Sequence, residues 1–385
     1  MRQPRIAIVH DWLDRWRGGE NVLAEIVHVY PQADLFSLVD FLADSSRARL
    51  GGKRARTSFL QRLPGARFYF RAMLPLFPRA IESLDVSGYD IVISSSHAVA
   101  KGVRSANSQL HICYCHTPMR YVWDRREQYL GPLGLDSGLR GKLIRRALDR
   151  LRDWDRRSSD RVTHFIANSE YIRSRIARCY DRDATVIYPP VDVRFFNPGE
   201  VVCAPAARNY YLTASRWVPY KRVDLIVAAF RELPERRLVV VGAGPEAIRV
   251  RAAAGPNVEF TGEVAPERLR ELLRGARGFL FAAEEDFGIL PVEAQACGTP
   301  VIAFGRGGSL ETVRGPECAR RTGLFFSEQS ASAIAAAVRK YEAIRVDFDP
   351  VDCRTNAQRF AVDRFRTELG EFVARAWRES AAQVR

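Results

Sequence analysis

Short runs of apolar, largely β-branched residues recur along this chain, and stretches with helical periodicity separate them. Apolar strands with helices between them are typical of parallel sheets that are covered on both faces. The sequence therefore predicts a doubly wound α/β fold. The expected strands are Ile6–Val9, Ile91–Ser94, Ile112–Tyr114, Phe165–Ala167, Thr185–Ile187, Tyr210–Thr213, Leu238–Val241, Val258–Phe260, Phe279–Phe281 and Val301–Ala303.

The chain is long enough for two such folds. Its 385 residues exceed what one ordinary core holds, and 47% of them are hydrophobic, which is enough for two cores. The strand pattern lapses between Tyr188 and Arg208, where the tandem Pro189-Pro190 blocks helix and sheet alike, so we place a linker there. The predicted parts are an N-terminal domain over residues 1–198, a C-terminal domain over 199–362 and a C-terminal helix over 363–385 that could cross back to the N-terminal domain.

The charge and the cysteine content indicate which partners and which cellular compartment to expect. A net charge of +14 favours anionic partners such as nucleotides, nucleic acid or the acidic inner leaflet of a membrane. Seven cysteines, an odd number without a CxxC pair, indicate a reducing compartment. Apolar runs of about 18 residues, the length of a membrane span, are absent, and a strand begins at Arg5 with no signal core before it. We therefore expect a cytoplasmic protein that is at most peripheral to a membrane.

The strongest signal for a ligand site is the run Ala282–Pro300, which follows an expected strand. Ligands of doubly wound sheets bind in the loops after the strands, so two such domains would hold one in a cleft between them. The run contains an acidic turn and a helix that we expect to open near Pro291, whose free amides could bind phosphate. Glu293, in its first turn, could accept hydrogen bonds from a ribose, and Glu285 would lie near the sugar. The alternative is that Glu293 only stabilises the helix dipole and Glu285 is a solvated loop acid.

A second signal, Ser215–Arg222, directly follows the strand Tyr210–Thr213. Arg216 and Lys221 would then stand at the carboxyl edge of the sheet, where a planar fork and a point charge can hold a diphosphate. The alternative is a solvated surface pair.

Two features of the N-terminal half point to the same edge. Gly18 and Gly19 lie between the first strand and the first helix, where backbone amides could approach a phosphate or sugar, although paired glycines also simply make turns. His116 ends the run His111–Pro118 and either enters the cleft or is a satisfied structural histidine. Side chains alternate along a strand, so the histidines and cysteines of this run cannot all reach one metal, and we predict no metal site.

A glycine pattern, Gly242-Ala-Gly244, satisfies the loose dinucleotide fingerprint. It opens the second unit of the C-terminal domain, whereas the fingerprint normally follows the first strand of its fold. We therefore do not expect a dinucleotide cofactor.

Taken together, these stretches resemble the retaining glycosyltransferases of family 4, whose GT-B architecture has two doubly wound Rossmann-like domains facing a central cleft. Glu285–Glu293 matches the E-x7-E motif of that family, and Ser215–Lys221 matches its diphosphate-binding segment. Further motifs resemble the WbaZ-type mannosyltransferases of bacterial O-antigen and exopolysaccharide assembly: His10–Leu13, Arg17–Glu20, Ser94–Gly102, Cys113–Tyr121 and Val186–Asp192.

The resemblance implies transfer of a hexose, mannose from GDP-mannose, to a lipid-linked oligosaccharide at the inner face of the plasma membrane, with no cofactor beyond the nucleotide sugar and no metal. It also assigns roles. His116 and Glu285 would act at the transferred sugar as catalytic residues, and the donor would be bound by Gly18, Gly19, Arg216, Lys221, Phe287, Gly288, Ile289, Leu290 and Glu293.

Two alternatives from other classes remain open. One is a GT-B epimerase or phosphorylase-like enzyme that acts on soluble substrates without a lipid acceptor. The other is a basic nucleic-acid-binding protein, for which the sequence has the charge but no motif, so we expect no nucleic-acid partner.

Two segments of the N-terminal half could contact an anionic membrane. Arg62–Arg79 interleaves arginines with aromatic and aliphatic residues, a composition suited to the headgroup boundary. Arg140–Trp154 places apolar residues on one face of an expected helix, with basic residues around it. In both, the alternative is that the apolar side chains face the core and the arginines are simply solvated.

Overall fold

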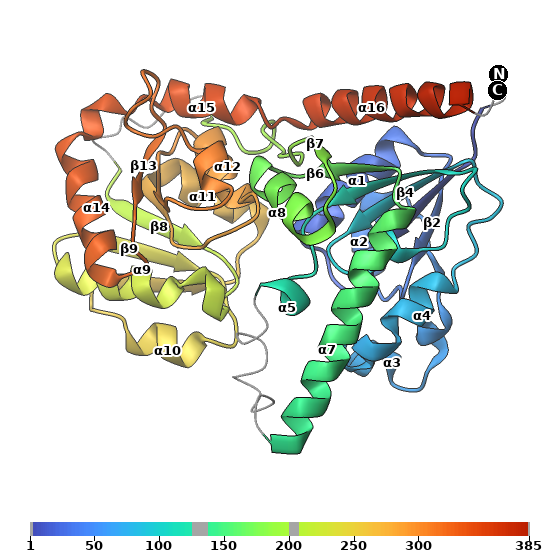
Figure 1. Ribbon diagram of the computed structural model, residues 1–385. Helices are drawn as coiled ribbons and strands as arrows, with labels where there is room; N and C mark the ends of the chain where they lie inside the picture. The colour runs from blue at the N-terminus through green and yellow to red at the C-terminus, as the bar shows by residue number, and fades with distance from the viewer. Residues whose placement is uncertain (1–2, 125–137, 200–207, 384–385) are drawn as a thin grey trace. The chain divides into compact units, whose positions relative to one another are not determined.

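The computed structural model describes residues 3–124, 138–199 and 208–383, which form two compact units (Figure 1). Unit 1 comprises Met1–Tyr188 and Phe365–Arg385, and unit 2 comprises Pro189–Arg364. Each unit has its own sheet and its own hydrophobic core.

The seven-stranded sheet of unit 1 has the order β3-β2-β1-β4-β5-β6-β7, and all its neighbours pair in parallel. Alternate residues of the first strand face opposite sides of the sheet. Ile6 and Ile8 lie in one core cluster with Leu23 and Phe365, whereas Ala7 and Val9 lie in another with Phe77 and Leu151. The strands are β1 Ile6–His10, β2 Asp34–Ser37, β3 Arg56–Thr57, β4 Ile91–Ser96, β5 Leu110–Cys115, β6 His164–Ala167 and β7 Ala184–Val186. The helices are α1 Gly18–Val29, α2 Asp44–Arg47, α3 Ala66–Tyr69, α4 Phe77–Glu82, α5 Arg120–Trp123, α7 Gly138–Ser158, α8 Glu170–Tyr180 and α16 Val362–Gln383.

The six-stranded sheet of unit 2 has the order β10-β9-β8-β11-β12-β13 and is also parallel. Its strands are β8 Tyr210–Ala214, β9 Arg237–Val241, β10 Val258–Gly262, β11 Ala276–Phe281, β12 Val301–Phe304 and β13 Gly323–Phe326. Its helices are α9 Val223–Ala229, α10 Ala247–Ala252, α11 Pro266–Gly275, α12 Ile289–Ala296, α13 Ser309–Thr312, α14 Ala331–Ala343 and α15 Pro350–Gln358. The predicted doubly wound α/β class is confirmed in both units.

Every strand expected from the sequence is present, and three more were missed: β2, β3 and β13. β2 carries an aspartate and a serine, and β3 is an Arg-Thr pair, so neither shows the apolar run that marks a buried strand. The C-terminal helix expected over residues 363–385 corresponds to α16, which begins at Val362 and is separate from α15, which ends at Gln358.

The linker segment after Tyr188 belongs to unit 2, whereas residues up to 198 were expected in the N-terminal domain. Val191 donates its N–H to the Phe360 carbonyl at 2.8 Å, and Arg354 donates to the Phe196 carbonyl at 2.9 Å. These bonds tie the proline-rich stretch to α15 and the turn after it. They join residues that are far apart in the sequence, so the change in composition that marks the linker does not show to which unit it belongs.

The C-terminal helix α16 returns to unit 1 from Phe365 onward. Phe365, Leu369 and Phe372 enter the same core cluster as α1 and β1. Arg366 on α16 also forms an ion pair with Glu25 on α1, with Nε 2.6 Å from Oε2.

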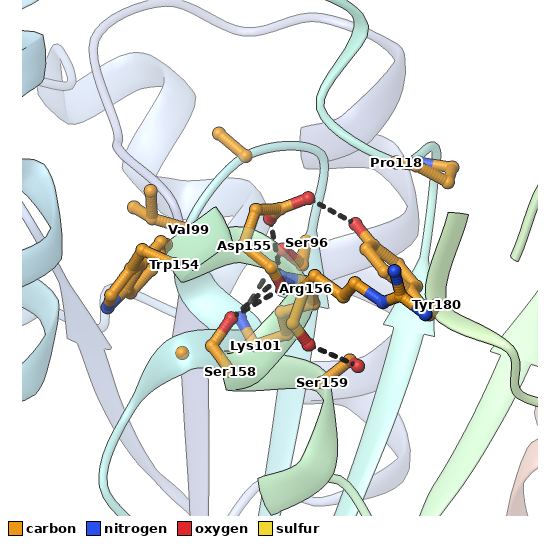
Figure 2. Close-up of polar contacts among 12 residues, drawn as sticks. Ser96, Val99, Lys101, Pro118, Trp154, Asp155, Arg156, Ser158, Ser159 and Tyr180 are labelled. Atoms are coloured by element: carbon orange, nitrogen blue, oxygen red, sulfur yellow. Dashed lines mark hydrogen bonds and ion pairs between the residues drawn. The ribbon is translucent and has the colours of Figure 1, made fainter. Parts of the chain in front are cut away.

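A buried lysine in the 3-10 turn Ala100–Gly102, after β4, anchors α7 within unit 1 (Figure 2). Lys101, only 1% exposed, donates to the Asp155 carboxylate, to the Asp155 carbonyl at 2.9 Å and to Ser158 Oγ at 2.9 Å. The second Asp155 oxygen accepts hydrogen bonds from Tyr180 OH and Trp123 Nε1, each at 2.8 Å. All three ammonium protons and both carboxylate oxygens are therefore satisfied without water.

Across the residues that the structure describes, no helix combines the length and apolar character needed to cross a bilayer. The longest helices, α7 and α16, both carry several charged residues.

Candidate functional site

In unit 1, three polar side chains meet where neighbouring strands end. His10 ends β1, Ser95 lies opposite it in the register of β4, and His116 follows β5. His10 Nδ1 lies 3.1 Å from Ser95 Oγ, which lies 2.8 Å from His116 Nε2. These contacts follow from the parallel sheet, because the carboxyl ends of adjacent strands share one edge.

The predicted glycine pair lies at this edge. α1 begins at Gly18, and a Cβ atom on Gly19 would lie 3.9 Å from His10 Cε1 and 4.0 Å from His116 Nε2. The structure thus brings Gly19 and His116 together, and their roles toward a ligand stay predictions.

A buried glutamate follows the glycines. Glu20 accepts a hydrogen bond from the Arg17 N–H at 2.8 Å, which caps α1, and its other oxygen lies 3.8 Å from His10 Nε2. Burial opposes ionisation of this carboxyl group, but the nearby His10 lowers its pKa below the usual value.

Next to this group, Asp11 and His97 form a second acid–histidine pair. The fully buried Asp11 carboxylate accepts hydrogen bonds from four backbone N–H groups, those of residues 97–100, and lies 2.9 Å from His97 Nδ1. Burial opposes its ionisation, but His97 and these bonds hold the pKa of Asp11 well below its usual range. In return, although burial disfavours the imidazolium, Asp11 raises the pKa of His97. This edge therefore carries a buried anion that favours a charged histidine.

His116 has the opposite protonation behaviour. Burial, together with the nearby His97 and His10, lowers the pKa of His116 to about 3. Its imidazole is therefore neutral at physiological pH, so it is a weak base that can still donate one hydrogen bond and accept another.

The alternation predicted along β5 is confirmed. Cys113 and Cys115 pack into one core cluster, whereas Tyr114 enters another. His111 is bonded to Ser94 Oγ at 2.9 Å, away from His116. Among the described residues, no group of three or more His, Cys, Asp or Glu side chains is arranged to hold a metal ion.

In unit 2, the segment after β8 crosses the Gly242-Ala-Gly244 turn at very close range. A Cβ atom on Gly242, whose φ is +115°, would lie 1.9 Å from the Ser215 carbonyl oxygen, and one on Gly244 would lie 2.3 Å from that of Trp217. The glycines are required by this backbone contact, which explains the fingerprint without a dinucleotide.

The predicted phosphate-binding and acidic segments of unit 2 meet directly. Lys221, at the end of the short 3-10 turn Pro219–Lys221, forms an ion pair with Glu285, and both side chains are largely buried. The loop that holds Glu285 packs on Gly307 and Gly308, and the Gly308 N–H donates to the Glu285 carbonyl at 2.8 Å. Arg216 is exposed and has no ion pair with any residue that the structure describes.

The helix after this loop begins earlier than the sequence suggested. Gly288, with φ +87°, is the N-cap, and α12 starts at Ile289, followed by Leu290, so Pro291 is its third residue. Glu293 consequently lies beyond the first turn, which corrects the prediction that it sits there. The free amides at the helix start belong to the first residues of α12. The preceding Phe287 is buried against Phe360, with ring centroids 5.3 Å apart.

Glu293 is strongly perturbed. Burial, reinforced by the charge of Asp192, raises its pKa to about 8. A carboxyl group with a raised pKa stabilises the fold below its unfolded pKa, and that contribution is lost as the pH rises through the folded value, here from about 4.5 to about 8.

Glu293→Gln is therefore expected to make the protein more resistant to heat than wild type at pH 9, because it removes the cost of a buried charge. We expect a gain of at least about 1 kcal/mol, or about 2 °C in Tm, measured by calorimetry. At pH 5 the two proteins should differ by less. An equal difference at both pH values would contradict a raised pKa.

Family models match both units. Residues 4–195 match the model described as Glycosyltransferase Family 4, and residues 203–360 match glycosyl transferases group 1. The chain belongs to glycosyltransferase family 4. The finer resemblance to WbaZ-type enzymes stays a prediction.

Two curated relatives of this family-4 chain are mycobacterial proteins. The GDP-mannose-dependent alpha-(1-6)-phosphatidylinositol monomannoside mannosyltransferase of Mycobacterium tuberculosis is 33% identical over 196 residues, which are 44% of this chain and 50% of that protein. A D-inositol 3-phosphate glycosyltransferase of Mycobacterium sp. (strain JLS) is 30% identical over 175 residues, 40% of each chain. The chain spans at most about half the length of the curated relatives it matches.

Solved structures share the fold over the whole chain. HepE of Anabaena, in complex with UDP and glucose, has a TM-score of 0.71 at 17% identity, covering 97% of this chain and 100% of that one. Sucrose-phosphate synthase of Thermosynechococcus elongatus has a TM-score of 0.73 at 19% identity, covering 98% and 100%. The likeness shows the two Rossmann-like domains of the GT-B class.

Five residues of this edge were not predicted as site residues from the sequence: His10, Asp11, Glu20, Ser95 and His97. A signal was available, since all of them lie in or directly after the carboxyl ends of β1 and β4, or open α1. They were quoted only within motifs, because their mutual contacts depend on strand order.

Proposed function

We propose that this protein is a retaining, metal-independent glycosyltransferase. It transfers a hexose, which is mannose supplied by GDP-mannose, to a lipid-linked saccharide in the synthesis of a bacterial surface polysaccharide. The contact of Lys221 with Glu285 beside the N-terminus of α12 carries the proposal. It places a cation, a carboxylate and free backbone amides at one edge of unit 2, which suits a diphosphate joined to a sugar.

The chemistry requires stabilisation of the charge that builds on the leaving diphosphate. Lys221 and the amides of α12 are preorganised donors for that charge, and the exposed Arg216 can add a second cation, so together they can replace a divalent ion. His116, with a pKa of about 3, is too weak a base to take the acceptor proton. That proton passes to the leaving phosphate oxygen, and His116 orients the sugar.

The donor is tested by thermal stabilisation with GDP-, UDP-, ADP- and dTDP-sugars in excess EDTA. GDP-mannose is expected to give the largest Tm increase, a choice supported by the relative named GDP-mannose-dependent. Transfer should persist in EDTA, and NMR of the product should show the anomeric configuration of the donor. Stabilisation by none of these sugars, or a strict need for added metal, would overturn the proposal.

A lipid-linked acceptor would bring the protein to the inner face of the plasma membrane, and the segment Arg62–Arg79 suits that surface. Phe68 and Tyr69 are 80% and 66% exposed, and the segment contains no acidic residue. Other side chains of the segment serve the fold: Phe70 is buried, and Arg71 forms an ion pair with Asp14 at 2.6 Å. The exposed arginines without an ion pair among the described residues are Arg62, Arg67 and Arg79.

The second segment, Arg140–Trp154, lies in α7, and its apolar side chains do not all face the same way: some face the core and one is exposed. Leu151 is buried and Trp154 packs over Gly102, so the later part faces the core. Leu143, 58% exposed, stays available to a membrane.

Arg67→Glu/Phe68→Ser is expected to weaken binding to phosphatidylglycerol vesicles at least tenfold, because each basic residue near an acidic leaflet contributes about 1 kcal/mol and the aromatic ring adds apolar burial. Binding is measured by co-sedimentation at low and high salt. Ile248→Ser, at an 88% exposed site of unit 2, is the matched control and should bind like wild type. Equal binding by wild type and the double variant would exclude this surface.

A further inference from the structure

One nitrogen of the buried His10 side chain, Nε2, has no hydrogen-bond partner among the residues that the structure describes. It lies 3.8 Å from Oε1 of Glu20. On the other side of the ring, Nδ1 lies 3.1 Å from Ser95 Oγ, which in turn lies 2.8 Å from His116 Nε2. Four side chains thus form a line from a buried carboxylate to the histidine that follows β5.

The number of donors and acceptors on each side chain determines the direction of the hydrogen bonds along this line. Ser95 has one hydroxyl proton, so it donates to one histidine and accepts from the other. Glu20 is a carboxylate that cannot donate, and its negative charge favours a proton on the nearest nitrogen, His10 Nε2. His10 Nδ1 is then the acceptor for Ser95, and Ser95 accepts the Nε2 proton of His116.

We propose that Glu20, acting through His10 and Ser95, fixes His116 in the tautomer whose bare Nδ1 accepts a hydrogen bond from a substrate hydroxyl. Glu20, His10 and Ser95 are thus positioning residues. The inference rests on the proposed function for the nature of the ligand, a sugar, since sugar hydroxyls donate whereas phosphate and carbonyl oxygens do not. The tautomer itself does not depend on that function.

A single isosteric substitution is expected to reverse the donor and acceptor roles along this line of side chains. In Glu20→Gln the Arg17 N–H, now 2.8 Å from a carboxylate oxygen, still needs an acceptor, so the amide oxygen faces Arg17 and the amide NH2 faces His10. His10 Nε2 becomes the acceptor, Nδ1 donates to Ser95, and Ser95 donates to His116. The proton of His116 should move from Nε2 to Nδ1.

The tautomer is measured by long-range 1H–15N NMR on protein labelled at histidine, with His116 assigned from the spectrum of His116→Gln. We expect an unprotonated Nδ1 in wild type and a protonated one in Glu20→Gln. In Ser95→Ala the line is broken, so adding Glu20→Gln should leave the signals of His116 unchanged. Ser94→Ala, which disrupts the separate Ser94–His111 contact of 2.9 Å, is the matched control and should leave His116 as in wild type.

A protonated Nδ1 in wild type, or the same His116 signals in wild type and Glu20→Gln, would overturn the proposal. If Glu20→Gln does not fold, the comparison of wild type with Ser95→Ala tests the proposal. Without the Ser95 hydroxyl, His116 is no longer held in one tautomer, so its signals must differ from those of wild type. Transfer assays form a separate arm: Glu20→Gln should lower kcat more than it raises KM for the donor. Absence of transfer by wild type would refute the proposed function while leaving the NMR result intact.

Discussion

Lys221→Ala is expected to lower glycosyl transfer at least about tenfold, because one charge-assisted contact is worth roughly 1.5–3 kcal/mol. Lys221 is held by Glu285 at the carboxyl edge of the unit 2 sheet, with only 13% of its side chain exposed. The ammonium is therefore positioned before a ligand arrives. Initial rates at saturating and at limiting nucleotide sugar measure the loss.

The control for this prediction is Lys340→Ala, which removes an exposed lysine from α14 and should keep full activity. Lys340→Ala should unfold near the wild-type temperature, whereas Lys221→Ala leaves the largely buried Glu285 without its cation and is expected to lose some stability. Rates are therefore compared at a temperature at which both variants are folded. Full activity of Lys221→Ala at both donor concentrations would show that Lys221 does not bind the diphosphate.

Lys101→Met is expected to cause the largest loss of stability, about 3–5 kcal/mol, because it leaves the Asp155 carboxylate buried without its cation. Figure 2 shows this carboxylate between Lys101 and Tyr180. Asp155 and Lys101 are each at most 1% exposed. Calorimetry should record a fall in Tm on the order of 10 °C.

Adding Asp155→Asn to Lys101→Met should restore a large part of that loss. The asparagine is neutral, and its oxygen can still accept from Tyr180 or Trp123, which now lie 2.8 Å from the carboxylate. A double variant as unstable as Lys101→Met would show that the loss comes from packing and not from the unpaired charge. An unchanged Tm in the single variant would contradict the role of Lys101 as an anchor.

Local signals predicted most of the scaffold because buried parallel strands are apolar runs that can be read without knowing their neighbours. β1 and β11 are visible in this way. β3 is not, since an Arg-Thr pair becomes a strand only by pairing with β2 at the sheet edge. The start of α12 was misplaced for a similar reason: Pro291 is compatible with several positions in a first turn, and the left-handed Gly288 decides among them.

The order and spacing of residues along one chain were enough to predict the fold class, the family and the segments that carry Arg216, Lys221, Glu285 and His116. The contacts between side chains could not be predicted in this way. The Lys221–Glu285 ion pair, the Lys101 anchor and the line from Glu20 to His116 each join residues that are far apart in the sequence. Strand order sets those contacts, and strand order arises from the packing of the whole domain, which no local pattern records.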